Sequence, residues 1–180
     1  MTEPVDTSPE AARIDALYRA KARAEVAGAE ALIAGAGVVR GQGDLLADVL
    51  LVKGDPGPGD TAKKRALAGD DGVAIGRALD ALGVSSARFA LCTRVGRRGA
   101  ERIERVRMMT EAIDPRTVVL LDAHAAEDFA AAFGCPKPVP GELTRVLGRE
   151  IVAVDGFEAS LADEGRKRRA WRQLKALGRG

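Results

Sequence analysis

The residues best suited to chemistry lie in a loop, rich in glycine and proline, that spans 53–60. It reads Lys-Gly-Asp-Pro-Gly-Pro-Gly-Asp and directly follows the apolar run 49–52. Its glycines let the backbone approach a ligand closely, and Asp55 and Asp60 bring two carboxylates that can position water or exchange protons. Ligands of open α/β sheets bind at the carboxyl ends of the strands. The loop is therefore a candidate catalytic site, and a rigid structural turn is the alternative.

Two phosphate-binding loops have similar glycine spacing, and the chain departs from both. A P-loop needs a lysine after its last glycine, but Asp60 stands there and would repel phosphate. A dinucleotide-binding loop must follow a strand, whereas the glycines of 35–43 follow a helical pattern. The sequence therefore gives no support to nucleotide binding through either loop.

The elements that must position the loop are read from the spacing of apolar residues. Short runs of branched aliphatic residues predict doubly buried strands at 49–52, 88–91, 117–121 and 150–154. Helical patterns occupy 9–33, 73–82, 100–113, 125–133 and 163–180. Strands that alternate with helices favour right-handed crossovers and a parallel sheet. We therefore predict an α/β fold with three α/β/α layers.

The chain length and composition fit a single domain. It has 180 residues, of which 46% are hydrophobic, and this is ample for one core. We expect a flexible tail at 1–8, with Ser8 capping the first helix, and one domain over 9–180. Residues 135–149 are expected to form a proline-rich connection.

Charge and cysteine content limit the partners and cofactors. The net charge of +2 is too small to indicate nucleic acid by itself. Cys92 and Cys135 are too few for a disulfide framework, an iron–sulfur cluster or a cysteine-rich zinc site. We expect no metal and no cofactor. No apolar run approaches the roughly 20 residues of a membrane helix. A cytoplasmic protein without a membrane partner is expected, and the oligomeric state is left open.

From the loop at 53–60 onward, the chain resembles the uracil-DNA glycosylase superfamily, nearest to its family 4 and family 5 branches. In those enzymes the first strand leads into a Gly-x-x-Pro-Gly or Gly-Gln-Asp-Pro-Tyr loop. The similar segments, in order, are 38–43, 47–52, 53–58, 67–69, 79–83, 113–121 and the helix face of Lys167, Trp171 and Leu174. The resemblance implies a central four-stranded parallel sheet and a groove that holds a flipped-out base. It also implies single-stranded or damaged DNA as partner.

The same resemblance implies roles for individual residues. Asp55 matches the carboxylate that positions water for base excision. The residues carried over to the base pocket are Gly54, Pro56, Gly57, Leu67, Cys92 and Thr93. Leu67 stands where the family has a stacking Phe, and Cys92 or Thr93 stands where it has a base-reading Asn. The chain contains no Asn at all.

Further candidates follow the other strands. His124, the only histidine, comes after the third strand and is either an acid/base group or a helix cap. Glu158 lies where the family has the histidine of a His-Pro-Ser motif, which this chain lacks. A carboxylate there opposes a leaving anion, but it can accept a hydrogen bond from a different base.

Two basic clusters are candidates for phosphate contact, with solvated helix faces as the alternative. They contain Arg94, Arg97, Arg98, Arg166, Lys167 and Arg168. The expected function is therefore base excision or damaged-base binding. Two alternatives stay open: a catalytically silent module that binds nucleic acid or protein, and binding or hydrolysis of a free nucleotide or nucleoside.

Overall fold

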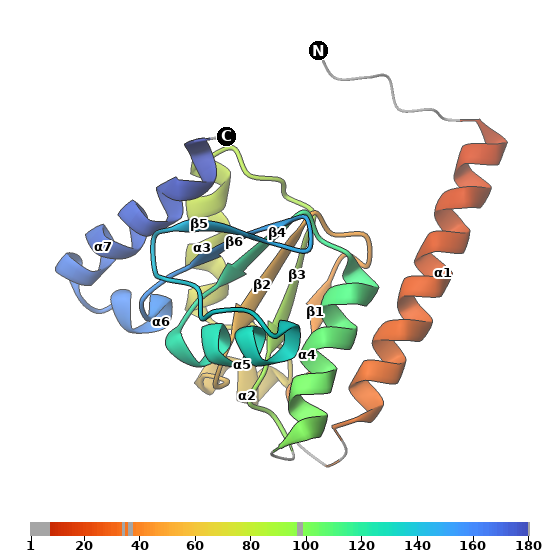
Figure 1. Cartoon of the computed structure of the whole chain (residues 1–180), viewed down its shortest axis with the longest axis horizontal. Coiled ribbons are helices and arrows are strands. Elements are labelled where there is room, and N and C mark those ends of the chain that lie inside the picture. The colour runs from red at the N-terminus through yellow and green to blue at the C-terminus, as the bar shows by residue number, and fades with distance from the viewer. Residues whose placement is uncertain (1–7, 34, 36–37, 97–98, 180) are drawn as a thin grey trace.

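The structure, a computed structural model, describes residues 8–33, 35, 38–96 and 99–179 (Figure 1). Its helices are α1 (Pro9–Ala31), α2 (Pro58–Lys63), α3 (Asp70–Ala81), α4 (Ala100–Ile113), α5 (Ala123–Phe133), α6 (Phe157–Ser160), α7 (Glu164–Leu174) and the 3₁₀ helix η1 (Lys175–Arg179). Its strands are β1 (Gln42–Gly43), β2 (Val49–Lys53), β3 (Arg88–Cys92), β4 (Thr117–Leu120), β5 (Leu143–Val146) and β6 (Arg149–Ala153). Each predicted strand and helix coincides with one of these elements, apart from a few residues at the ends and the helix predicted over 163–180, which is divided into α7 and η1.

The described strands form one mixed sheet in the order β1-β3-β2-β4-β6-β5. The inner strands β3, β2, β4 and β6 pair in parallel, and the two edge strands pair antiparallel. The sheet therefore has six strands and is mixed, whereas the resemblance implied four parallel strands. The edge strands escaped prediction because β1 is only two residues long and β5 lies in the segment expected to be a connection.

Helices cover both faces of the sheet because the inner strands are apolar on both sides (Figure 1). Leu50 and Val52 pack into one buried cluster with side chains of α4 and α5. Val49 and Leu51 point the other way, into a cluster with side chains of α3 and α7. Because β2 packs against helices on both faces, its position in the sheet is fixed. The loop that follows it is therefore held at the carboxyl edge of the sheet.

Helix α1 begins as predicted, since the Ser8 side chain accepts a hydrogen bond from the backbone N–H of Ala11 at 3.1 Å. Its predicted apolar face, however, packs only toward the C-terminal end. Ile14 and Tyr18 are 48% and 61% exposed, whereas Ala29 is buried. The reason is length: Figure 1 shows the N-terminal half of α1 running past the end of α4. The spacing of apolar residues along α1 does not show where the neighbouring helix α4 ends.

Candidate functional site

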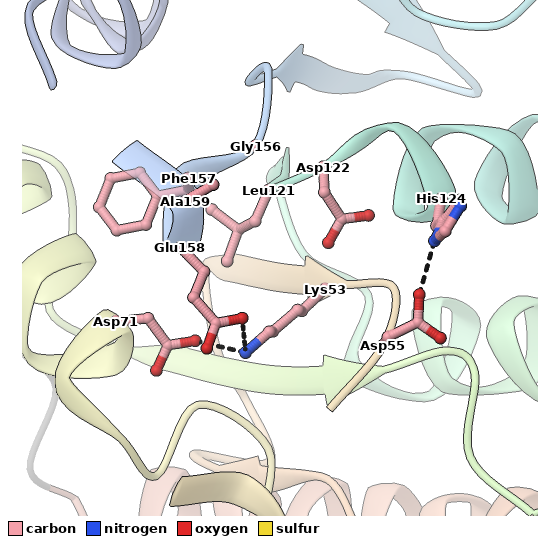
Figure 2. Close-up of a pocket in the computed structure, with 10 residues that line it drawn as sticks. All are labelled: Lys53, Asp55, Asp71, Leu121, Asp122, His124, Gly156, Phe157, Glu158 and Ala159. Carbon is pink, nitrogen blue, oxygen red and sulfur yellow. Dashed lines mark hydrogen bonds and ion pairs between the residues drawn. The ribbon is translucent and has the colours of Figure 1, made fainter. Parts of the chain in front are cut away.

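A pocket of about 230 Å³ opens at the carboxyl edge of the sheet, next to the loop that follows β2. Figure 2 shows its lining, which comes from the ends of β2 and β4 and from the starts of α3, α5 and α6. Its ionisable lining side chains are Lys53, Asp55, Asp71, Asp122, His124 and Glu158. Leu121 and Phe157 add apolar walls. The sheet topology thus gathers polar groups that lie far apart in the sequence.

The loop after β2 is held directly against the start of α5. Asp122 caps that helix, its Oδ1 accepting the backbone N–H of Ala125 at 2.8 Å. Its Oδ2 accepts the backbone N–H of Gly54, also at 2.8 Å. A Cβ atom at Gly54 would overlap the Cβ of His124 and lie 2.6 Å from Asp122 Oδ1. Glycine is therefore required for this approach, which brings the next residue of the loop to His124.

Asp55 and His124 form a hydrogen-bonded pair at the mouth of the pocket (Figure 2). The distance from Asp55 Oδ2 to His124 Nδ1 is 2.5 Å, and the two side chains are 61% and 49% exposed. Because an ionised carboxylate only accepts hydrogen bonds, the Nδ1 proton faces Asp55 and the lone pair of neutral histidine lies on Nε2. Nε2 has no partner among the described residues. The pair therefore has the arrangement of a general base oriented by a carboxylate.

Behind this pair, Lys53 is buried among three carboxylates. Its Nζ lies 2.9 Å from Asp60, 2.7 Å from Asp71 and 2.9 Å from Glu158. Burial alone would lower the pKa of Lys53, but the hydrogen bonds to the three carboxylates outweigh it and raise the pKa. Lys53 therefore stays charged, and the cluster carries an excess of negative charge.

Asp60 pairs with Lys53 in this cluster and also accepts hydrogen bonds from backbone N–H groups. Its Oδ2 accepts the backbone N–H of Gly57 and its Oδ1 that of Ala68, both at 2.8 Å. It is almost fully buried and does not line the pocket, and no contact between Asp55 and Asp60 is found within the described residues. The two candidate carboxylates of the loop therefore have different surroundings: Asp55 is exposed at the pocket mouth, and Asp60 has the environment of a structural residue.

Three of the residues carried over to a base pocket lie away from the pocket and are buried in the core. Leu67, Cys92 and Thr93 are all buried, and none lines the pocket. Thr93 Oγ1 donates to Asp128 Oδ2 at 2.6 Å, and burial together with the Asp60 carboxylate raises the pKa of Cys92 to about 12. Gly54 lies beside His124, and Gly57 lies against the lining side chains of Glu158 and Lys53, where an added Cβ would overlap Glu158 Oε1.

The two basic clusters differ in how far their charges are already paired. Arg94 is bound to Asp128 at 3.2 Å and to Glu127 at 3.1 Å, while Arg97 and Arg98 lie outside the described residues. On α7, which packs against α6 at the pocket edge, Arg166, Lys167 and Arg168 are exposed. Lys167 pairs with Glu164, and the other two have no ion pair with any described residue. Free positive charge is thus found on α7.

Sequence reasoning missed Lys53, Asp71 and Asp122 as site residues. Asp122 carried a usable signal, because a short polar residue between a predicted strand and a predicted helix is typical of an N-cap. Lys53 and Asp71 carried none. They are 18 positions apart, and only the folded loop brings them into contact.

Comparisons with known proteins add no assignment. No protein-family model matches the chain, and no curated protein matches it. Within the described residues, no group of three His, Cys, Asp or Glu side chains has a geometry that would hold a metal ion. The described helices include none with the length and apolar character needed to cross a membrane.

Proposed function

We propose that this chain hydrolyses the N-glycosidic bond of a nucleotide in DNA, with the Asp55–His124 pair activating the water. The observation that carries the proposal is the 2.5 Å contact between these two side chains at the pocket mouth. The order of the four parallel inner strands and the helices on both faces also suit the three-layer architecture that the glycosylase resemblance implies. Base excision needs a pocket beside a water-activating group, and both are at this edge of the sheet.

Each group of the site has a separate role in the proposed reaction. His124 Nε2 takes a proton from water as the water oxygen attacks C1′ of the sugar. Asp55 holds the ring and stabilises the imidazolium that forms. The C1′–N bond breaks, and its electron pair leaves with the base. Exposed Arg166 and Arg168 on α7 supply the phosphate contacts that give most of the affinity for nucleic acid.

The proposal is tested by base release from single- and double-stranded oligonucleotides that carry uracil, hypoxanthine, xanthine or N7-methylguanine. Asp55→Asn and His124→Gln should each lower release by about 100-fold or more, the usual contribution of a general base. The double variant should be no slower than the worse single variant, because the two groups act as a unit. Asp80→Asn is the matched control, since Asp80 is equally exposed and also ion-paired, with Arg88. Absence of release from every substrate would refute the proposal.

A DNA-binding module without catalysis is the second candidate. The burial of Leu67, Cys92 and Thr93 favours it, because these positions then offer no surface to a base. Such a module would bind oligonucleotides without releasing any base. Arg166→Gln with Arg168→Gln should reduce the salt dependence of binding by about two phosphate contacts. Arg13→Gln with Arg23→Gln on α1 removes the same charge from exposed positions and serves as control.

A further inference from the structure

The pocket is strongly acidic. Among the described residues that line it, the carboxylates are Asp55, Asp71, Asp122 and Glu158, and the one lysine is Lys53. With His124 neutral, three negative charges are in excess. An ammonium group has three N–H donors, and those of Lys53 face Asp60, Asp71 and Glu158. Lys53 therefore has no donor left for a ligand.

This charge distribution bears on the leaving group of the proposed reaction. A neutral base such as uracil leaves as an anion and needs a donor or a cation at the atom where charge develops. The lining offers it carboxylates instead, and Glu158 occupies the face opposite the catalytic pair. Figure 2 shows Glu158 and Asp71 on one side of the pocket and Asp55 with His124 on the other. An anionic base would thus depart toward negative charge.

A base that is already positive has the opposite requirement. Its ring cation is attracted to the carboxylates before reaction, and it leaves as a neutral molecule that needs no donor. Positive charge then develops only on the sugar, whose oxocarbenium character is stabilised by nearby carboxylates. An acidic pocket without a free donor is therefore matched to a cationic leaving base.

Building on the proposed glycosidic hydrolysis, we infer that the substrate base is a cationic purine, alkylated on a ring nitrogen such as N7 or N3. Water attacks C1′ and gives its proton to His124 Nε2. The C1′–N9 bond breaks, and its electron pair neutralises the charge of the purine ring. The products are a neutral alkylpurine, a hydroxyl on C1′ and the imidazolium of His124 paired with Asp55.

Glu158 is the side chain that discriminates between bases. It comes from α6, and its Oε2 lies 2.9 Å from Lys53 Nζ. Because its side chain is 48% exposed, it can contact a base in the pocket without a change in the fold. The Asp71 side chain, by contrast, is buried and forms an ion pair with Lys53. Replacement of Glu158 by Gln keeps the shape and removes one charge.

The test compares release of N7-methylguanine with release of uracil and hypoxanthine from oligonucleotides of otherwise identical sequence. Wild-type protein should release N7-methylguanine at least about 100-fold faster than uracil. Glu158→Gln should lower that rate about 10- to 100-fold, the order expected for one charge or contact at an active site. Glu104→Gln is the matched control, because Glu104 on α4 is similarly exposed and pairs with Arg107 at 2.9 Å. It should leave the rate unchanged.

The outcomes separate this inference from the function on which it rests. Release of uracil or hypoxanthine as fast as N7-methylguanine, dependent on His124, would overturn the inference and keep glycosidic hydrolysis. Release of no base would overturn both. An unchanged rate in Glu158→Gln would also overturn it. Binding gives a second measurement that needs no Glu158 variant: His124→Gln protein should bind an N7-methylguanine oligonucleotide at least about tenfold more tightly than the guanine oligonucleotide, and equal affinity would refute the inference.

Discussion

At the scale of single residues, the candidate site depends on a position that has no side chain. Gly54 lies so close to α5 that an added Cβ would overlap His124 and approach Asp122 Oδ1. We expect Gly54→Ala to lower the free energy of unfolding by about 1–3 kcal/mol, as overpacking does, and to separate Asp55 from His124. Urea unfolding and the proposed base-release assay measure the two effects.

For Gly28→Ala we expect the opposite effect on the free energy of unfolding. Gly28 lies inside α1, and the nearest atom to its added Cβ is Met108 Cε at an ordinary 3.7 Å. Alanine there should raise the free energy of unfolding by about 0.5–1 kcal/mol, because it favours the helix. Equal effects of the two substitutions would show that the contact between Gly54 and α5 is not tight.

Cys92 makes stability depend on alkaline pH. Burial, and then the charge of Asp60, raises its pKa from 9.0 to about 12. The folded chain therefore keeps a proton that the unfolded chain loses above pH 9, and this stabilisation declines as pH rises. Between pH 9 and about 10, where most lysines of the unfolded chain still keep their proton, we expect a loss of up to about 1.4 kcal/mol per pH unit.

Urea unfolding across this pH range, with Cys92→Ala alongside, checks the expectation. The variant should show a flatter dependence. Cys135→Ala should keep most of the slope, because Cys135 is only half-buried. A wild-type free energy of unfolding that is constant from pH 9 to about 10 would contradict a buried neutral thiol beside Asp60.

How much of the site could be predicted differs from residue to residue. Asp55 and His124 were candidates because each follows a predicted strand, and the carboxyl ends of parallel strands meet at one edge. Glu158 was a candidate because the resemblance places a motif histidine at its position. The pairing of Asp55 with His124 was not predicted, since it depends on the close approach of Gly54 to α5. Lys53 looks like any charged residue at a strand end, and nothing in the sequence shows that three carboxylates surround it.

At the scale of elements, the inner strands and long helices were predictable because each carries its own apolar period. Strand β5 was not predicted, because the turn that joins it to β6 lacks the sequence typical of a hairpin turn. Leu147 and Gly148 have φ angles of 48° and 82°, as in the two-residue hairpin turn that favours Asn-Gly. The chain has no Asn, and a leucine in this conformation is strained.

Leu147→Asn should therefore stabilise the hairpin of β5 and β6. Leu147 is 73% exposed, so its replacement loses little packing. We expect the free energy of unfolding to rise by about 0.5–1 kcal/mol, which thermal or urea unfolding would detect. Leu143→Asn, the same substitution inside β5, should give no gain, since asparagine is disfavoured in strands. A neutral or destabilising Leu147→Asn would show that the left-handed turn carries no strain.

At the scale of the whole molecule, the sheet joins two cores, one packed against each of its faces. Strand β2 sends Leu50 and Val52 into the cluster under α4 and α5, and Val49 and Leu51 into the cluster under α3 and α7. Neither helical layer can lose its packing without exposing one side of the same strands. The two faces should therefore unfold in one cooperative transition, as expected for one domain over 9–180.

Two probes that weight the faces differently test this coupling. Trp171, the only tryptophan, lies on α7, while far-ultraviolet circular dichroism is weighted toward α1 and α4, the two longest helices of the opposite layer. Leu79→Ala in α3 and Met109→Ala in α4 each truncate a fully buried side chain, and each should lower the free energy of unfolding by about 2–5 kcal/mol. Because the strands belong to both cores, either variant should shift the fluorescence and dichroism transitions equally. If Leu79→Ala moved the fluorescence transition alone, the faces would be independent units. The carboxyl edge, where residues of β2, α3 and α5 meet, would then lose its shape before the rest of the fold.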